Sequence, residues 1–166
     1  MKTLLEFDSP QIYCDMDGVL ADFDNGIKDM IGGKFSDARW DELPDDFFLQ
    51  LEPMKDANKL WGFIGKYDPF ILTAVPRSER GPIAARATED KTRFMKRWFG
   101  VSADKMYPVQ RVNKANFAMD GRDNRPNLLI DDHLKNIQAF QKAGGIGVRH
   151  TSASNTIKQL KEIGYK

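Results

Sequence analysis

The sequence predicts an α/β fold in which a parallel sheet of about five strands carries helices on both faces. Two observations predict it. Five short apolar segments are spread along the chain, and the clearest of them end in acidic residues, threonine or glycine, as buried strands do when they enter a loop. Segments with the apolar spacing of amphipathic helices lie between them. Strands that alternate with helices form parallel sheets covered on both sides, the arrangement of Rossmann-like folds.

The strand segments are not equally clear. Residues 127–132 (NLLIDD) form a strong candidate, whereas residues 105–109 (KMYPV) form a weaker one and residues 145–148 a short one. The expected strands are residues 11–16, 69–75, 105–109, 127–132 and 145–148. Ligands of such sheets bind beyond the carboxyl ends of the strands.

Three longer segments have helical spacing. In residues 88–99, Phe94, Met95, Trp98 and Phe99 share one face. Residues 134–143 and 155–163 repeat the pattern, the latter with Ser154 or Asn155 as its cap. Lys114 is expected to open a short helix over residues 114–119. Residues 77–87 and 120–126 are expected to be loops.

Residues 26–66 interrupt the alternation. They are acidic, rich in aromatic residues and without an apolar strand, so we expect a small, mainly helical cap insertion. The core is then formed by residues 1–25 and 67–166. The aromatic side chains are expected to pack into a small core of their own, and one or two could face the active site and stack on a base or sugar. They are Phe35, Trp40, Phe47, Phe48 and Trp61.

Length and composition indicate one compact globular domain. The 166 residues are 41% hydrophobic, no window approaches eighteen consecutive apolar residues, and the first ten residues do not resemble a secretory signal. We therefore expect a cytoplasmic protein that does not bind membranes. The single cysteine, Cys14, lies in an apolar run and is expected to be a buried structural thiol.

Charge is distributed unevenly along the chain. Residues 1–60 carry 14 acidic and 6 basic side chains, whereas residues 61–166 carry 10 acidic and 19 basic ones. This difference could orient an anionic substrate, although charges on helix faces also serve simply to interact with water.

Polar residues follow four of the expected strands. Asp15 and Asp17 end the first, Thr73 the second and Asp131 with Asp132 the fourth, while Lys114 follows the third. Because parallel strands bring their carboxyl ends to one edge, these side chains should converge. Crowded carboxylates repel one another unless a cation lies among them, and an oxygen-rich site suits Mg²⁺.

The string DMDGVL at residues 15–20 resembles the first motif of the haloacid dehalogenase-like phosphatases. Thr73, a lysine and the Asp131-Asp132 pair follow in that superfamily's order. The longer string DMDGVLADF, with LLIDD and AGGIG, is most similar to the deoxyribonucleotidase-type 5′-nucleotidases and their bacteriophage relatives. The resemblance covers nearly the whole chain.

This resemblance implies a role for each matching residue. Asp15 would be the nucleophile that forms an aspartyl-phosphate, and Asp17 would be the acid and base. Thr73 and Lys114 would stabilise the charge of the phosphoryl group, with Gly18 and Ala74 also binding substrate. Magnesium would be held by Asp15, the backbone carbonyl of Asp17, Asp131 and Asp132, with the inner-shell member of the last pair left open.

Several alternatives stand beside these assignments. Lys105 also flanks the third strand and competes with Lys114 for the lysine role. A calcium loop also begins Asp-x-Asp-Gly, but Gly26 stands where its glutamate is needed. A receiver domain combines similar residues in the reverse order. A catalytically idle relative that only binds phosphate or nucleotide is the remaining alternative outside enzymes.

A (deoxy)nucleoside monophosphate is the favoured substrate, because of the subfamily resemblance and the aromatic insertion. A sugar phosphate or a 3′-phosphate on a nucleic acid end is the alternative within the same chemistry. Contacts to a nucleic acid backbone would come from Arg77, Arg80, Arg86, Arg93, Lys96 and Arg97. The oligomeric state is left open by the sequence.

Overall fold

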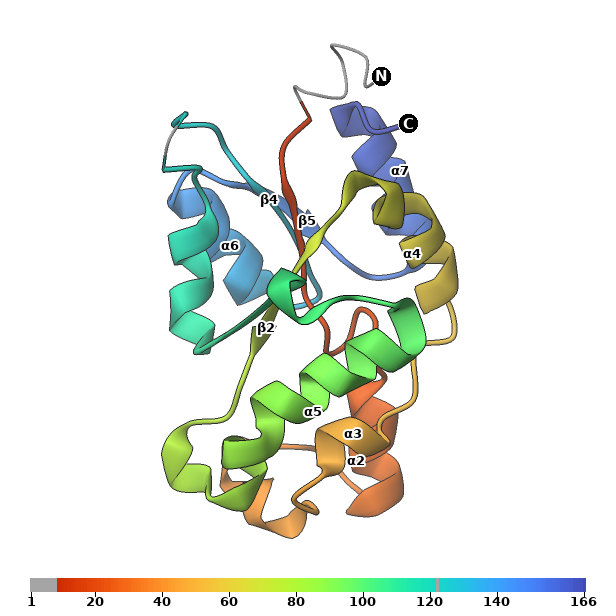
Figure 1. The fold of residues 1–166 in the computed structure, drawn as a ribbon, viewed down its shortest axis with the longest axis vertical. Helices are drawn as coiled ribbons and strands as arrows, with labels where there is room; N and C mark the ends of the chain where they lie inside the picture. Colours follow the sequence, from red (N-terminus) through yellow and green to blue (C-terminus); the bar gives the residue numbers. More distant parts are fainter. Residues whose placement is uncertain (1–8, 122) are drawn as a thin grey trace.

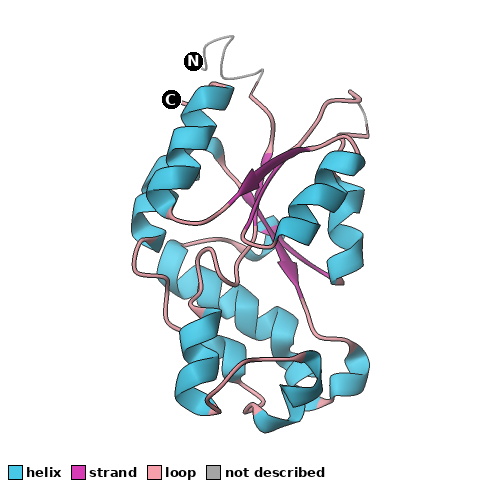
Figure 2. Cartoon of the chain, turned by 180° about the vertical axis from the view of Figure 1, so that it is seen from behind, coloured by secondary structure: helices cyan, strands magenta, loops and turns pink. Residues whose placement is uncertain are grey.

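The computed structural model describes residues 9–121 and 123–166 and has the expected α/β fold, seen from two sides in Figures 1 and 2. The strands, all near their expected positions, are β1 (Ile12–Cys14), β2 (Phe70–Ala74), β3 (Met106–Val109), β4 (Leu128–Asp131) and β5 (Ile146–Arg149). They form one parallel sheet in the order β3-β2-β1-β4-β5. Strand order reverses beside β1, so a ligand crevice is expected where β1 and β4 end.

Both faces of the sheet are buried. Along β1, Ile12 and Cys14 point into the larger core, while Tyr13 points into a smaller one on the other face. Cys14 is a buried free thiol, as expected. Helices α4 (Ala57–Ile64), α5 (Pro82–Phe99) and α7 (Ala153–Ile163) contribute to the larger core, and α6 (Leu134–Lys142) to the smaller one. In the described part of the chain, no helix is long and apolar enough to cross a membrane.

Residues 26–66 are helical, as expected, and begin within α2 (Phe23–Met30), followed by η1 (Asp37–Glu42) and α3 (Phe47–Gln50). Their rings pack on one another, with the Phe35 and Trp40 centroids 4.8 Å apart and those of Phe47 and Phe48 5.3 Å apart. This cluster is continuous with the main core and not separate from it. The division into a core and a cap at residues 26 and 66 stays a prediction, and residues 1–8 of that core lie outside the described residues.

Helix α4, which the prediction includes in the insertion, packs against α7. Figure 1 shows the two helices side by side, apart from α2 and α3. Trp61 of α4 packs on Phe99 at the end of α5, with ring centroids 5.5 Å apart. Short 3-10 turns η2 (Gly65–Tyr67) and η4 (Ala103–Lys105) lead into β2 and β3.

Three expectations about loops and helix ends are wrong. The cap of α7 is Ser152, whose Oγ accepts a hydrogen bond of 3.1 Å from Asn155 N, and not Ser154 or Asn155. Residues 77–87 do not form a loop: they contain η3 (Ser78–Arg80) and the start of α5, which begins six residues earlier than predicted. Gly81, with φ +78°, makes the turn, and Pro82 opens the helix, where a missing N–H costs no hydrogen bond. Lys114 lies in the middle of η5 (Arg111–Phe117) and does not open a helix. Residues 120–126 are irregular as expected, except residue 122, which lies outside the described residues.

Candidate active site

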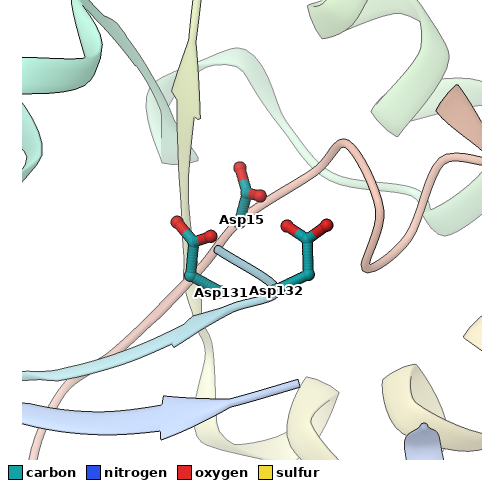
Figure 3. A group of neighbouring side chains, drawn as sticks. All are labelled: Asp15, Asp131 and Asp132. Carbon is teal, nitrogen blue, oxygen red and sulfur yellow. The ribbon is translucent and has the colours of Figure 1, made fainter. Parts of the chain in front are cut away.

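Three carboxylates meet at the carboxyl ends of the neighbouring strands β1 and β4. Asp15 follows β1, Asp131 ends β4 and Asp132 comes next, and one oxygen from each lies within 4.8 Å of the others. A backbone hydrogen bond of 2.8 Å from Asp15 N to Ile130 O fixes the spacing of the two strand ends. Figure 3 shows the three side chains extending from these ends toward a common region. The predicted convergence of the first and fourth strand ends is present.

Lys114 lies between two of these carboxylates. Its Nζ is 2.9 Å from Asp15 Oδ1 and 2.9 Å from Asp131 Oδ2, and its side chain is almost fully buried. Burial alone would lower the pKa of Lys114, but the two carboxylates outweigh it and raise the pKa. The lysine is therefore a permanent cation beside Asp15. Lys105, the alternative, is bound instead to the exposed Asp68, 2.7 Å away.

The carboxylates are poorly stabilised by the protein alone. Burial raises the pKa of Asp15 well above its usual range, with Lys114 opposing this effect and the neighbouring acids adding to it. Burial, and then the charge of Asp131, also raise the pKa of Asp132. Three hard oxygen donors with one ammonium group leave negative charge uncompensated, and this donor set fits Mg²⁺.

Asp131 and Asp132 have different surroundings. Asp131 is fully buried, and its oxygens accept hydrogen bonds from His133 N at 2.8 Å and Asn136 Nδ2 at 3.0 Å, besides Lys114. Asp132 is only partly buried and lies over Gly18, where a Cβ atom would come within 2.2 Å of Asp132 Oδ2. Gly18 also has φ +80°, which favours glycine. Position 18 thus has no room for a side chain.

Asp17 is anchored by a residue that the sequence did not suggest. Its side chain is not part of the three-carboxylate group; its Oδ2 instead accepts a hydrogen bond of 2.7 Å from Lys91 Nζ. Lys91, on α5, also donates to Thr73 Oγ1 at 2.9 Å and to Ala74 O at 2.6 Å, and it is completely buried. The Lys91 ammonium group therefore links Asp17, after the first strand, to Thr73 at the end of the second.

The insertion reaches this lysine through an aromatic ring. Lys91 Nζ lies 4.4 Å from the centre of the Phe48 ring, a cation–π geometry, and Phe48 is buried. Phe48 is on α3, in the predicted cap. At least one aromatic residue of the insertion thus reaches the candidate site, although it does so through its contact with Lys91 and not through an open face.

The predicted basic cluster is largely paired with acids. Arg77 and Arg80 both bind Asp37 of η1. On α5, Arg86 pairs with Asp90 and Arg93 with Glu89. These side chains neutralise local carboxylates, which does not favour their use as a phosphate-binding surface.

A relative among known proteins indicates the family of this chain. No protein-family model matches the chain. A protein of Vibrio phage KVP40 named "Putative 5′(3′)-deoxyribonucleotidase" is 33% identical over 132 residues, which are 78% of this chain and 69% of the phage protein. At this identity and coverage the two proteins share a fold and an ancestor. The chain therefore belongs to the 5′(3′)-deoxyribonucleotidase family represented by this phage protein.

Proposed function

We propose that this protein is a magnesium-dependent phosphomonoesterase of the haloacid dehalogenase-like type, acting on deoxynucleoside monophosphates through a phosphorylated Asp15. The observation that carries the proposal is the meeting of Asp15, Asp131 and Asp132 beside the buried Lys114. Nucleotidase chemistry is supported by the name of the phage relative.

The first half-reaction transfers the phosphoryl group to the protein. A carboxylate oxygen of Asp15 attacks phosphorus in line, the bond from phosphorus to the ester oxygen breaks, and that oxygen takes a proton from Asp17. Mg²⁺ held by Asp15, Asp131 or Asp132 and the backbone carbonyl of Asp17 would supply positive charge to the phosphoryl oxygens. Lys114 adds a fixed cation beside the nucleophile.

The second half-reaction regenerates the protein. Asp17 takes a proton from water, the water oxygen bonds to phosphorus, and the bond from phosphorus to Asp15 breaks to release phosphate. The hydrogen bonding of Asp17 suits its two roles as acid and as base. Its Oδ2 is bound to Lys91, whereas its buried Oδ1 has no hydrogen-bond partner among the described residues and is free to carry the proton.

Thr73 is suited to bind a phosphoryl oxygen. Its Oγ1 accepts the hydrogen bond from Lys91, so its own proton is directed elsewhere and can be donated to substrate. Ala74 lies beside Lys91 at the end of β2, where its backbone amide could complete the phosphate site. The Gly18 amide donates to Ala21 O at 2.9 Å, so Gly18 would contribute through the space that its missing side chain leaves beside Asp132.

The test compares Asp15→Asn with the native chain on a panel of nucleoside and deoxynucleoside monophosphates, sugar phosphates and p-nitrophenyl phosphate. We expect Mg²⁺-dependent release of phosphate, fastest from deoxynucleotides, and a loss of at least about a thousandfold in Asp15→Asn. The exposed Asp45→Asn is the matched control and should keep full activity. Reaction in H₂¹⁸O, followed by mass spectrometry of the phosphate, checks that water attacks phosphorus. A tenfold preference for a sugar phosphate would overturn the substrate assignment.

A further inference from the structure

A groove between two helices, outside the candidate active site, is not used by this chemistry. It lies between α4 and α7, has a volume of about 560 Å³, and is lined by Lys59, Ser154, Ile157, Lys158, Lys161 and Glu162. None of the residues of the candidate active site lines it. Figure 1 shows the two helices together on one flank of the sheet.

The two helices run in the same direction, because their first turns are joined and their last turns are near each other. Asp56, just before α4, accepts a hydrogen bond of 2.7 Å from Ala153 N at the start of α7. Lys59 Nζ donates to Ser154 Oγ at 2.7 Å, also near both starts. Toward the ends, Lys161 Nζ lies 5.8 Å from the centre of the Phe63 ring. The groove therefore follows the helices for about two turns, or roughly 10 Å.

The side chains that line the groove carry a net positive charge, from three lysines and one glutamate. Within residues 9–121 and 123–166, none of the three groove lysines is paired with a carboxylate, and Glu162 is the one acid in the lining. Lys66 extends the row beyond the groove, with its Nζ 5.2 Å from the Phe63 ring and 5.3 Å from the Tyr67 ring. This contrasts with α5, where Arg86 and Arg93 are paired with acids of their own helix.

We propose that this groove binds the backbone of a single-stranded nucleic acid. Ammonium groups at successive helical turns match a repeating anion better than a single phosphate. The apolar side chain of Ile157 in the lining offers a surface beside these charges for a base or sugar of the bound strand. At about 3.4 Å per nucleotide of stacked strand, the groove spans about three phosphates.

The experiment measures fluorescence anisotropy of a labelled twenty-nucleotide oligothymidylate in EDTA. The oligonucleotide has no terminal phosphate, so the result does not depend on the proposed phosphatase activity. Three contacts predict a slope of log K against log salt of about −2, so binding weakens about twentyfold between 50 and 200 mM NaCl. The variant Lys59→Gln/Lys158→Gln/Lys161→Gln should lose at least tenfold in affinity and most of that slope.

The matched control is Arg93→Gln/Lys96→Gln/Arg97→Gln, which removes the same charge from exposed positions of α5. It should change affinity less than twofold. Both variants should have the melting temperature and circular dichroism spectrum of the native chain, which shows that they are folded. Three outcomes would overturn the proposal. They are an equal loss of affinity in both variants, no binding of the oligonucleotide by the native chain, and its displacement by thymidine monophosphate at the same phosphate concentration.

Discussion

The ammonium group of Lys91 lies 2.7 Å from Oδ2 of Asp17, although the two residues are 74 positions apart. Lys91 is fixed in turn by Thr73 and Ala74 O, so three segments of the chain determine where the Asp17 carboxylate points. In the proposed reaction Asp17 handles both protons, and its orientation should limit the rate.

Lys91→Met is therefore expected to lower kcat by about a hundredfold or more, with a smaller effect on KM. The substitution keeps the bulk of the side chain but leaves Asp17 Oδ2 without its donor. Lys91→Arg should recover part of the activity. Steady-state kinetics with a pH profile of kcat checks this, because loss of an oriented acid and base changes the shape of the profile.

The control for that series is Lys96→Met on the same helix, whose side chain is exposed. It should leave both kcat and the profile unchanged. If Lys91→Met lowered the melting temperature but left kcat intact in the folded fraction, Lys91 would have a structural role only.

Asp132→Asn should stabilise the metal-free protein and reduce the stabilisation that Mg²⁺ gives. Burial raises the pKa of Asp132, so its ionised form lowers the free energy of unfolding at neutral pH. This destabilisation disappears as the pH falls toward the range near 4, where an exposed aspartate titrates. Mg²⁺ at a hundred times its Kd should stabilise the native chain by about 2.7 kcal/mol, or about 5–10 °C in Tm.

Differential scanning fluorimetry with and without Mg²⁺ measures both effects, with Asp45→Asn as the control. A variant that melted lower without metal, yet gained the native shift with it, would show that Asp132 does not take part in the metal site.

Magnesium binding should release protons at mildly acidic pH. Asp15 and Asp132 have raised pKa values and must be ionised to bind the cation, so affinity should rise with pH well above the range near 4 of exposed aspartates. Titration calorimetry at about pH 6 in buffers of different ionisation enthalpy counts these protons. Affinity that stayed constant between about pH 5 and 8 would contradict the raised pKa values.

Gly18→Ala is expected to destabilise the protein by about 1–3 kcal/mol and to abolish most activity. The new Cβ would collide with Asp132 Oδ2, and φ at this position is +80°. Gly62→Ala is the contrasting substitution, since a Cβ there meets no atom within 4 Å and the residue lies inside α4. It should stabilise the protein by up to about 1 kcal/mol. Chemical denaturation measures both values.

The strand-end residues could be predicted because each one directly follows an apolar run. The parallel sheet then brings Asp15 and Asp131 together, regardless of where the helices begin and end. Lys91 gives no such signal, since it lies inside a helix among other basic residues. Its spacing from Phe94 and Met95 places it on the apolar face of α5, and a lysine on a buried face is the sign that could have revealed it.

The start of α5 and the position of Lys114 could not be predicted, because both depend on local backbone conformation that the residue types alone do not determine. Gly-Pro at residues 81–82 is typical of turns, and here it opens a helix because Gly81 adopts a positive φ. Lys114 reaches Asp15 from the middle of a 3-10 helix, a short element without a clear apolar period.

Lys114 is bound by carboxylates from both β1 and β4, and it is carried by the segment that joins β3 to β4. A chain emerging from the ribosome has no such arrangement until β4 has docked beside β1 in the sheet. Unfinished chains therefore have no place to take up an ion or a phosphate ester. If the proposed function holds, Mg²⁺ can bind only after β4 has docked beside β1, so metal binding would come late in folding.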